Sequence, residues 1–186
     1  MTAHGLLLAA GAGSRMGRPK ALVTGEDGTP WLVHGIATLR DGGCGEVTVV
    51  LGAAADEAVA LVPDGVDVVV ADDWASGMSA SLRAGLGALA GSGADLALVT
   101  LVDLPDVHAD VVRRVLAAAT GTTTLARATF DGRPGHPVAL GRDYWSGVTG
   151  AASGDGGARD YLDTHDVLAV ECGDLATGRD VDRPPT

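Results

Sequence analysis

A glycine-rich, basic segment near the start of the chain carries the strongest chemical signal. The apolar run Leu6–Leu8 leads into Ala9-Ala10-Gly11-Ala12-Gly13-Ser14, and Arg15, Arg18 and Lys20 follow. Small side chains leave successive backbone N–H groups open to an anion, and no carboxylate occurs in the first 25 residues to neutralise the cations. This pattern predicts a loop that binds a polyphosphate.

The spacing of this segment separates it from two common phosphate motifs. Gly11, Gly13 and Gly17 do not match the Gly-x-Gly-x-x-Gly of dinucleotide-binding proteins. Lys20 neither follows a glycine directly nor precedes a Ser or Thr, as a Walker A loop requires. A glycine-rich turn without a ligand is the alternative interpretation. Lys20 is the only lysine in the chain, and an ammonium placed where arginine is otherwise used favours the phosphate site.

Carboxylates near the ends of predicted strands are candidate metal ligands. Asp103 follows the hydrophobic run Leu96–Val102, and Mg²⁺ on a nucleotide needs only one or two protein carboxylates. Asp103 could equally cap a helix that starts near Pro105, and the residue alone leaves both roles open. Asp180 and Asp182 would share one face of an extended segment. They could complete a metal site with Asp103, but the bare pattern favours a solvated tail.

Three hydroxyls, those of Ser76, Ser79 and Ser81, open a predicted amphipathic helix. At least one is expected to cap that helix. Ser79 or Ser81 is a candidate contact to a nucleotide base, and Gly77 would allow a flat ring to approach closely. The chain contains no Asn or Gln, so base recognition must depend on backbone groups, hydroxyls, Arg, His and carboxylates.

The elements that position these residues alternate between strands and helices. Hydrophobic periodicity predicts strands at 6–8, 46–51, 66–71 and 95–102, and helices at 31–39, 53–62, 79–89 and after Pro105. This alternation indicates a parallel sheet with right-handed crossovers. Ligands of such sheets bind outside the carboxyl ends of the strands, where the phosphate loop, the serine segment and Asp103 all fall.

The second half of the chain is less regular. We expect a strand at 122–130, a turn at 131–137 leading into Val138–Leu140, a mobile glycine-rich loop at 147–157, a short helix at 158–164 and an edge strand at 167–171. The predicted fold class is therefore α/β: one three-layer Rossmann-like domain over residues 1–186, with a mostly parallel sheet and a small antiparallel addition.

Composition limits the partners. The formal net charge of −11 argues against nucleic acid and anionic membrane surfaces, and no apolar run is long enough to span a membrane. Cys44 and Cys172 lack metal-ligand spacing, and no basic leader segment precedes the first apolar run. We therefore expect a reduced, cytoplasmic setting.

Five blocks of sequence carry a family resemblance. In chain order they are Leu8–Lys20, Gly77–Leu82, Asp103–Pro105, Gly135–Val138 and Gly154–Arg159. Together they resemble the molybdenum cofactor cytidylyltransferases, a branch of the nucleotidyltransferases with the molybdopterin guanylyltransferase type of fold. The first block marks the wider family. The Gly-His-Pro and Gly-Asp-x-Gly-Ala-Arg blocks are more particular to the cofactor branch.

The resemblance implies transfer of CMP from CTP to the phosphate of molybdopterin, with release of pyrophosphate and delivery of the product to a molybdenum hydroxylase. In that family Ala-Ala-Gly, here Ala9-Ala10-Gly11, goes with CTP, whereas Ala-Gly-Gly goes with GTP. Arg15 and Lys20 would act on the triphosphate, and Asp103 with Asp182 would hold Mg²⁺. The family's Asp-x-Asp-Thr-Pro run here reads Asp180-Val181-Asp182-Arg183-Pro184. The implied nucleotide-binding residues are Leu8, Ala9, Ala10, Gly11, Gly13, Ser14, Gly77, Ser79 and Ser81, and the implied substrate residues are His136, Pro137, Asp155 and Arg159.

Three other activities stay open. One is a nucleotidyltransferase of the same fold that uses GTP or acts on a sugar or polyol phosphate. Another is a non-catalytic module that delivers the cofactor. The third is a nucleotide-dependent oxidoreductase of the short-chain type, which requires Tyr-x-x-x-Lys. Here His165 stands four residues after Tyr161, and no lysine follows Lys20.

Overall fold

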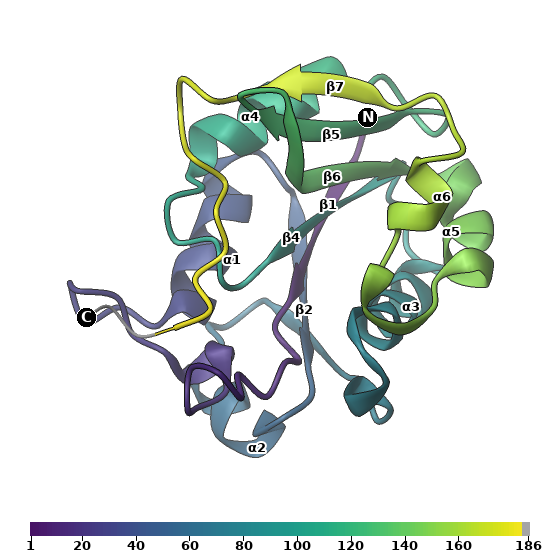
Figure 1. Ribbon diagram of the computed structural model, residues 1–186. Helices are drawn as coiled ribbons and strands as arrows, with labels where there is room; N and C mark the ends of the chain where they lie inside the picture. Colours follow the sequence, from purple (N-terminus) through teal and green to yellow (C-terminus); the bar gives the residue numbers. More distant parts are fainter. Residues whose placement is uncertain (184–186) are drawn as a thin grey trace.

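A seven-stranded sheet organises the part of the chain that the computed structural model describes, residues 1–183 (Figure 1). The strand order is β3-β2-β1-β4-β6-β5-β7, and β6 alone runs antiparallel to its neighbours β4 and β5. The strands are β1 (Ala3–Leu8), β2 (Glu46–Leu51), β3 (Asp67–Val70), β4 (Leu96–Leu101), β5 (Leu125–Phe130), β6 (Arg133–Gly141) and β7 (Leu168–Glu171). The predicted α/β class, mostly parallel with a small antiparallel addition, is confirmed. Pro184, which would end the Asp-x-Asp-Thr-Pro run, and the two residues after it lie outside the described residues.

Helices cover both faces of the sheet and give the predicted three-layer, Rossmann-like arrangement (Figure 1). One face carries α1 (Trp31–Asp41) and α4 (Ala109–Ala118), and the other carries α3 (Met78–Leu89), α5 (Trp145–Ala151) and α6 (Arg159–Leu162). In β1, Leu7 packs in the core with α1 and α4, whereas Leu6 and Leu8 pack in the core with α3. Burial on both faces explains why the central strands are almost wholly apolar.

Element boundaries follow the predictions closely in the first half of the chain. β2 begins and ends where predicted, at residues 46 and 51. The helix predicted at 53–62 is instead the short α2 (Ala55–Ala58), followed by a 3-10 turn at Val59–Leu61. No helix within residues 1–183 is long and apolar enough to cross a membrane.

The glycine-rich segment predicted as a loop is largely helical. Trp145–Ala151 form α5, and Trp145 and Val148 are buried in the core beside α3. The indole N–H of Trp145 donates to the Leu140 carbonyl at 2.8 Å. A Cβ at Gly147 would lie 2.5 Å from the Tyr161 hydroxyl oxygen, so this glycine permits close packing and does not indicate a mobile loop.

The turn between β5 and β6 is shorter than predicted. Only Asp131 and Gly132 form it, both with positive φ (52° and 75°), and residues 133–137 belong to β6. Glu171 at the end of β7 closes this turn, because its carboxylate accepts from the Thr129 hydroxyl at 2.8 Å and from the Asp131 and Gly132 N–H groups at 2.9 and 3.1 Å. Hydrogen bonds from Thr129, Gly173 and Gly132 lower the pKa of Glu171 from 4.5 to about 2.

This depressed pKa predicts a pH-dependent contribution to stability. The folded state stabilises the ionised form of Glu171 more than the unfolded state does. The contribution of Glu171 to the free energy of unfolding is therefore fully present above about pH 4.5 and is lost as pH falls toward 2. The difference in urea midpoint between wild type and Glu171→Gln should be largest at neutral pH and shrink at pH 3. Glu57→Gln, at an exposed position on α2, is the control. A difference that stays constant with pH would contradict the prediction.

Candidate active site

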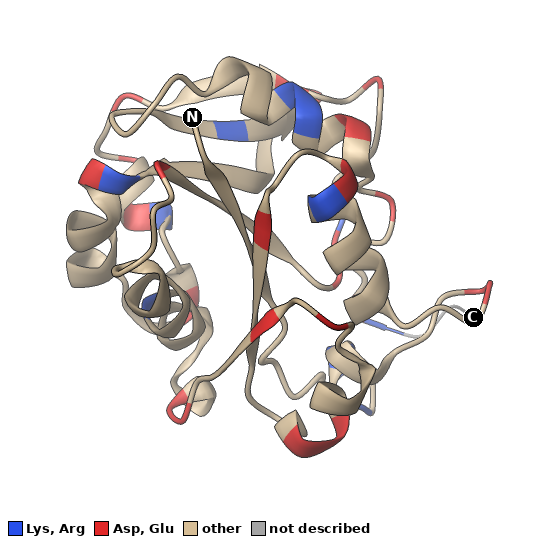
Figure 2. Ribbon diagram, turned by 180° about the vertical axis from the view of Figure 1, so that it is seen from behind, with Lys and Arg blue, Asp and Glu red and all other residues tan. Residues whose placement is uncertain are grey.

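The loop after β1 crosses the carboxyl end of the sheet and places cations there. Gly13 has φ +59°, and a Cβ at this position would lie 2.0 Å from the Arg18 carbonyl oxygen, so the loop requires glycine. The Gly13 carbonyl accepts from the Met16 N–H at 2.8 Å, and Met16 is buried. Acidic residues are spread over the fold (Figure 2), so this short cationic stretch is a local exception in a chain of net charge −11.

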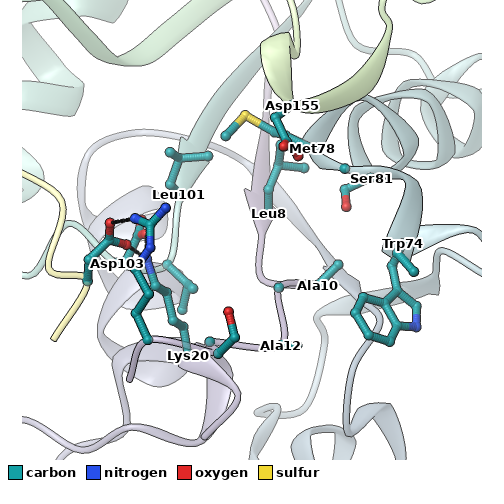
Figure 3. A pocket seen from close by; sticks show the side chains of 18 residues that line it. Leu8, Ala10, Ala12, Lys20, Trp74, Met78, Ser81, Leu101, Asp103 and Asp155 are labelled. Atoms are coloured by element: carbon teal, nitrogen blue, oxygen red, sulfur yellow. Dashed lines mark hydrogen bonds and ion pairs between the residues drawn. The ribbon is translucent and has the colours of Figure 1, made fainter. Parts of the chain in front are cut away.

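A pocket of about 460 Å³ opens beside this loop. Residues 10–15, the segment 74–81 and the end of β4 supply most of its wall. Figure 3 shows Lys20 and Asp103 at one end of the pocket and Trp74 and Ser81 at the other. The pocket therefore has a charged end and an end with an aromatic ring and a hydroxyl.

A second pocket, of about 710 Å³, adjoins the first. Arg15, Lys20, Asp103 and Asp182 line both pockets. Away from this shared wall, the second pocket is lined by residues of β5, β6, α6 and the preceding glycine-rich turn, among them Arg127, His136, Gly157 and Arg159. Two binding spaces thus meet at one charged wall.

Ion pairs hold that shared wall together. Lys20 Nζ lies 2.5 Å from Asp103 Oδ2 and 2.6 Å from Asp182 Oδ1, and Arg15 Nη1 lies 2.5 Å from Asp182 Oδ2. Burial acts to lower the pKa of the Lys20 ammonium, but its hydrogen bonds to Asp103 and Asp182 outweigh this and raise the pKa above the ordinary value. The hydrogen bond from Lys20 lowers the pKa of Asp182, and the pair is therefore charged at neutral pH.

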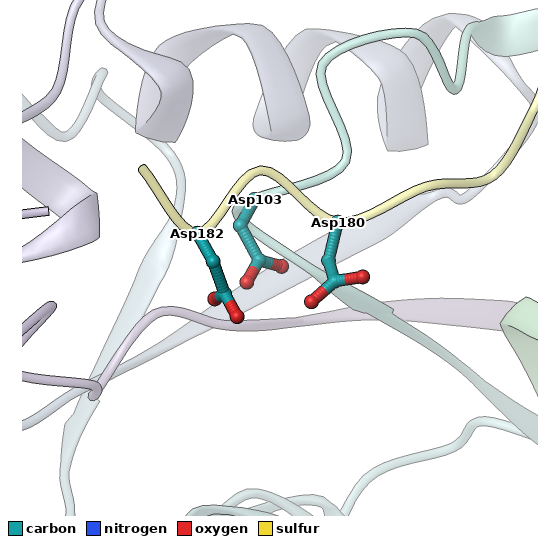
Figure 4. A group of neighbouring side chains, drawn as sticks. All are labelled: Asp103, Asp180 and Asp182. Atoms are coloured by element: carbon teal, nitrogen blue, oxygen red, sulfur yellow. The ribbon is translucent and has the colours of Figure 1, made fainter. Parts of the chain in front are cut away.

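Three carboxylates at this wall could hold a divalent metal. Asp103, Asp180 and Asp182 each offer an oxygen, and these oxygens lie within 4.8 Å of one another (Figure 4). Asp103 Oδ1 is buried and has no hydrogen-bond partner among the described residues. The Val181 N–H donates to the Asp103 carbonyl at 2.9 Å, which pins the C-terminal segment to the end of β4. Carboxylate oxygens are the ligands that Mg²⁺ and Mn²⁺ prefer, so these residues fit such an ion.

Two interpretations based on the bare sequence pattern are wrong. Asp103 does not cap a helix, because α4 begins at Ala109 with His108 in the N-cap position. Asp182 does not lie in a solvated tail, because it pairs with Lys20 and Arg15.

The serine segment also differs from expectation. No side chain caps α3, whose N-cap residue is Gly77. Ser79 is fully buried, and its hydroxyl accepts from the Gly157 N–H at 3.1 Å, so it holds the 154–157 turn and does not line either pocket. A Cβ at Gly77 would lie 2.5 Å from Asp155 Oδ1, so the absence of a side chain at Gly77 allows the 154–157 turn to pack against it. Ser81 does line the first pocket.

The other sequence-predicted residues divide between the pockets and the core. Ala9 and Pro137 are buried and line neither pocket. Asp155 lines both pockets, and His136 and Arg159 line the second. Burial, assisted by the charge of Arg159, lowers the pKa of His136 to about 4, so this imidazole is neutral at physiological pH.

Sequence reasoning did not assign several pocket residues to the site, among them one aromatic, one cationic and one sulfur-containing side chain. Half-buried Trp74 lines the first pocket, Arg127 lines the second, and Met78 lines both. Trp74 follows Asp72 and Asp73 just beyond the carboxyl end of β3, and that position could have marked it. Nothing in the local pattern around Arg127 distinguishes it from the other arginines.

Known proteins resemble this chain over most of its length. Residues 5–169 match the MobA-like NTP transferase domain. The chain is 39% identical to nicotine blue oxidoreductase of Paenarthrobacter nicotinovorans, covering 96% of this chain and 91% of that protein. It is 31% identical to molybdenum cofactor guanylyltransferase of Rhodobacter capsulatus, covering 78% of this chain and 67% of that protein.

Solved structures are similar to this chain in fold over nearly its whole length. Rv0371c of Mycobacterium tuberculosis H37Rv superposes with a TM-score of 0.80 at 30% identity, covering 98% of this chain and 93% of that one. A structure of Rv0371c in complex with manganese has a TM-score of 0.77 at 26% identity, covering 92% and 89% of the two chains.

Proposed function

Because this chain belongs to the MobA-like NTP transferase family, we propose that it transfers CMP from CTP to the phosphate of molybdopterin or of the molybdenum cofactor. The observation that carries the proposal is the wall of Lys20, Asp103 and Asp182 shared by two pockets. A nucleotide with its base toward Trp74 and its phosphates toward Lys20 would present its α-phosphate at this wall. A phosphate monoester in the second pocket would then face it.

The chemistry depends mainly on position and charge. An oxygen of the monoester forms the new bond to the α-phosphorus, the bond to the bridging oxygen breaks, and pyrophosphate leaves with the electron pair. The nucleophile is already an anion, so no strong general base is needed. Lys20 and Arg15 would take the charge of the departing pyrophosphate, and backbone N–H groups of residues 11–14 would bind the outer phosphates. Asp103 and Asp182, with Asp180 beside them, would hold Mg²⁺ or Mn²⁺, which neutralises phosphate charge when bound.

The second pocket suits an anionic partner with a polar ring. Arg127 and Arg159 bring guanidinium groups to its wall, and a guanidinium binds a phosphate or a polar ring edge through two parallel hydrogen bonds. Asp155 would accept hydrogen bonds from ring N–H or amino groups. In this proposal the reaction takes place in the cytoplasm, and a molybdenum hydroxylase receives the product.

Thermal shifts and pyrophosphate release test the proposal. The resemblance to the cytidylyltransferases implies CTP, because Ala9-Ala10-Gly11 matches the run that goes with CTP in that family, whereas the relative from Rhodobacter capsulatus is named a guanylyltransferase. With Mg²⁺ present, CTP should raise the Tm more than GTP does, by mass action on the folded state. Pyrophosphate should appear only when molybdopterin is added with CTP. Equal shifts would remove the preference for CTP, and no shift with any nucleoside triphosphate would overturn the transferase proposal.

A second candidate function is a nucleotide-dependent reduction. The 39% identity to a relative named nicotine blue oxidoreductase favours it, and the loop after β1 could also bind the pyrophosphate of a nicotinamide dinucleotide. The absence of a lysine after Lys20 argues against the short-chain mechanism. The two activities are separated by two assays run in parallel. One monitors the consumption of NADH or NADPH in the presence of nicotine blue by absorbance, and the other measures the release of pyrophosphate.

A further inference from the structure

The Lys20 ammonium occupies the position between the carboxylates that would hold a metal. Its Nζ hydrogen-bonds to Asp103 Oδ2 at 2.5 Å and to Asp182 Oδ1 at 2.6 Å. Asp103 and Asp182 are also two of the three residues whose oxygens gather within 4.8 Å. An oxygen that accepts a hydrogen bond from the ammonium is not free to ligate a divalent ion at the same time, so Lys20 competes with a metal for two of the three carboxylates.

We propose that Lys20 is the resident cation of this carboxylate cluster when no nucleotide is bound, and that a divalent metal and a polyphosphate displace it together. The polyphosphate draws the Lys20 ammonium and the Arg15 guanidinium onto its own oxygens. The carboxylate oxygens of Asp103 and Asp182 are then free for the metal. This inference deepens the proposed function and rests on it for the identity of the polyphosphate.

Charge balance supports this exchange. The carboxylates of Asp103, Asp180 and Asp182 face the cations of Lys20 and Arg15, so the cluster is nearly neutral before any ligand arrives. A divalent ion entering beside the Lys20 ammonium, whose side chain is only 16% exposed, would meet a like charge at close range under weak solvent screening. A polyphosphate removes that repulsion by giving the ammonium another partner.

The two sides of this exchange differ in mobility. The C-terminal segment is tied down, because Val181 N–H donates to the Asp103 carbonyl at 2.9 Å. Upstream, the Thr177 N–H and hydroxyl donate to Asp106 Oδ2 at 2.7 and 2.5 Å. Lysine, by contrast, carries its charge on a flexible four-carbon chain. The carboxylates therefore stay in place, Asp103 Oδ1 already lacks a partner among the described residues, and the ammonium is the group that moves.

The consequence is reciprocal coupling between the two ligands. Since a metal gains the oxygens that Lys20 releases, polyphosphate tightens metal binding and metal tightens polyphosphate binding by the same factor. Lys20 thus disfavours metal binding in the empty site, although it assists the transfer itself. A residue that served only to support the metal ligands would have the opposite effect on metal binding.

Mn²⁺ titrations followed by electron paramagnetic resonance test this inference without any turnover. In the absence of nucleotide, Lys20→Met should bind Mn²⁺ about tenfold more tightly than wild type, within the usual range of coupling between sites. Arg18→Met is the matched control, because Arg18 lies in the same loop but contacts none of the three carboxylates among the described residues; its Mn²⁺ affinity should equal that of wild type. Circular dichroism checks that each variant is folded.

A second measurement uses the wild-type protein alone. Its affinity for CTP, measured by calorimetric titration, should be higher with Mn²⁺ than without it, by a similar factor. Unchanged or weaker Mn²⁺ binding by folded Lys20→Met, or equal CTP affinity with and without Mn²⁺, would overturn the inference. If no nucleoside triphosphate binds at all but Lys20→Met still tightens Mn²⁺ binding, the proposed function fails and the exchange at the carboxylates stands.

Discussion

Lys20→Ala is expected to lower the turnover number by about 100-fold or more, the usual cost of removing one preorganised electrostatic group from a transition state. The ammonium lies in the wall common to both pockets, where charge would develop as pyrophosphate leaves. Its raised pKa keeps it protonated throughout the neutral range. The pH profile of the wild-type enzyme should therefore show no step from Lys20 between about pH 6 and 9.

Two companion variants make the Lys20 measurement specific. Lys20→Arg keeps the charge but replaces a compact ammonium by a planar guanidinium, so it should recover only part of the lost rate. Arg18→Ala removes an exposed cation of the same loop that lines neither pocket, and it should keep a nearly wild-type rate. Wild-type turnover by Lys20→Ala would remove Lys20 from the mechanism.

Local patterns were sufficient to predict the parts of the site that follow directly from a strand. The apolar runs of β1 and β4 end in the loop after Leu8 and in Asp103, and parallel pairing brings these two ends together. Continuous apolar runs and the alternation of strands with helices are enough to predict this part of the geometry. The apolar composition of β1 and the mostly parallel class of the sheet have the same cause, which is that helices bury both faces of the central strands.

Contacts between distant parts of the chain could not be predicted in this way. Asp182 pairs with Lys20 although the two residues are 162 positions apart in the sequence, whereas the bare pattern favoured a solvated tail and the family resemblance implied only a metal ligand at Asp182. Ser79 offered a hydroxyl at a helix start, yet tertiary packing gave that hydroxyl to the Gly157 N–H. Gly147 looked like a flexible position because the sequence does not show that Tyr161 packs against it. In each case the sequence shows the chemical type of the residue, but a contact with a distant part of the chain determines its role.

Asp103→Asn keeps the shape of the side chain, and among such variants it is expected to cause the largest loss of catalytic rate. Neutralising the most buried of the three clustered carboxylates should weaken Mg²⁺ or Mn²⁺ binding and remove the metal-dependent part of catalysis. A metal ion supplies several kcal/mol to such a transition state, which at about 1.36 kcal/mol per factor of ten corresponds to a loss of about 1,000-fold in rate. The rate measured against Mg²⁺ concentration should become low and flat.

Asp180→Asn separates a specific loss from a general change in charge. Asp180 belongs to the same cluster but is exposed and is not hydrogen-bonded to Lys20 among the described residues. It should therefore shift the Mg²⁺ requirement upward with a smaller loss in maximal rate. Because Asp103→Asn would leave Asp182 as the remaining charged partner of Lys20, the Tm of each variant must be measured beside its rate. A folded Asp103→Asn protein with wild-type activity and an unchanged metal response would place the metal ligand elsewhere.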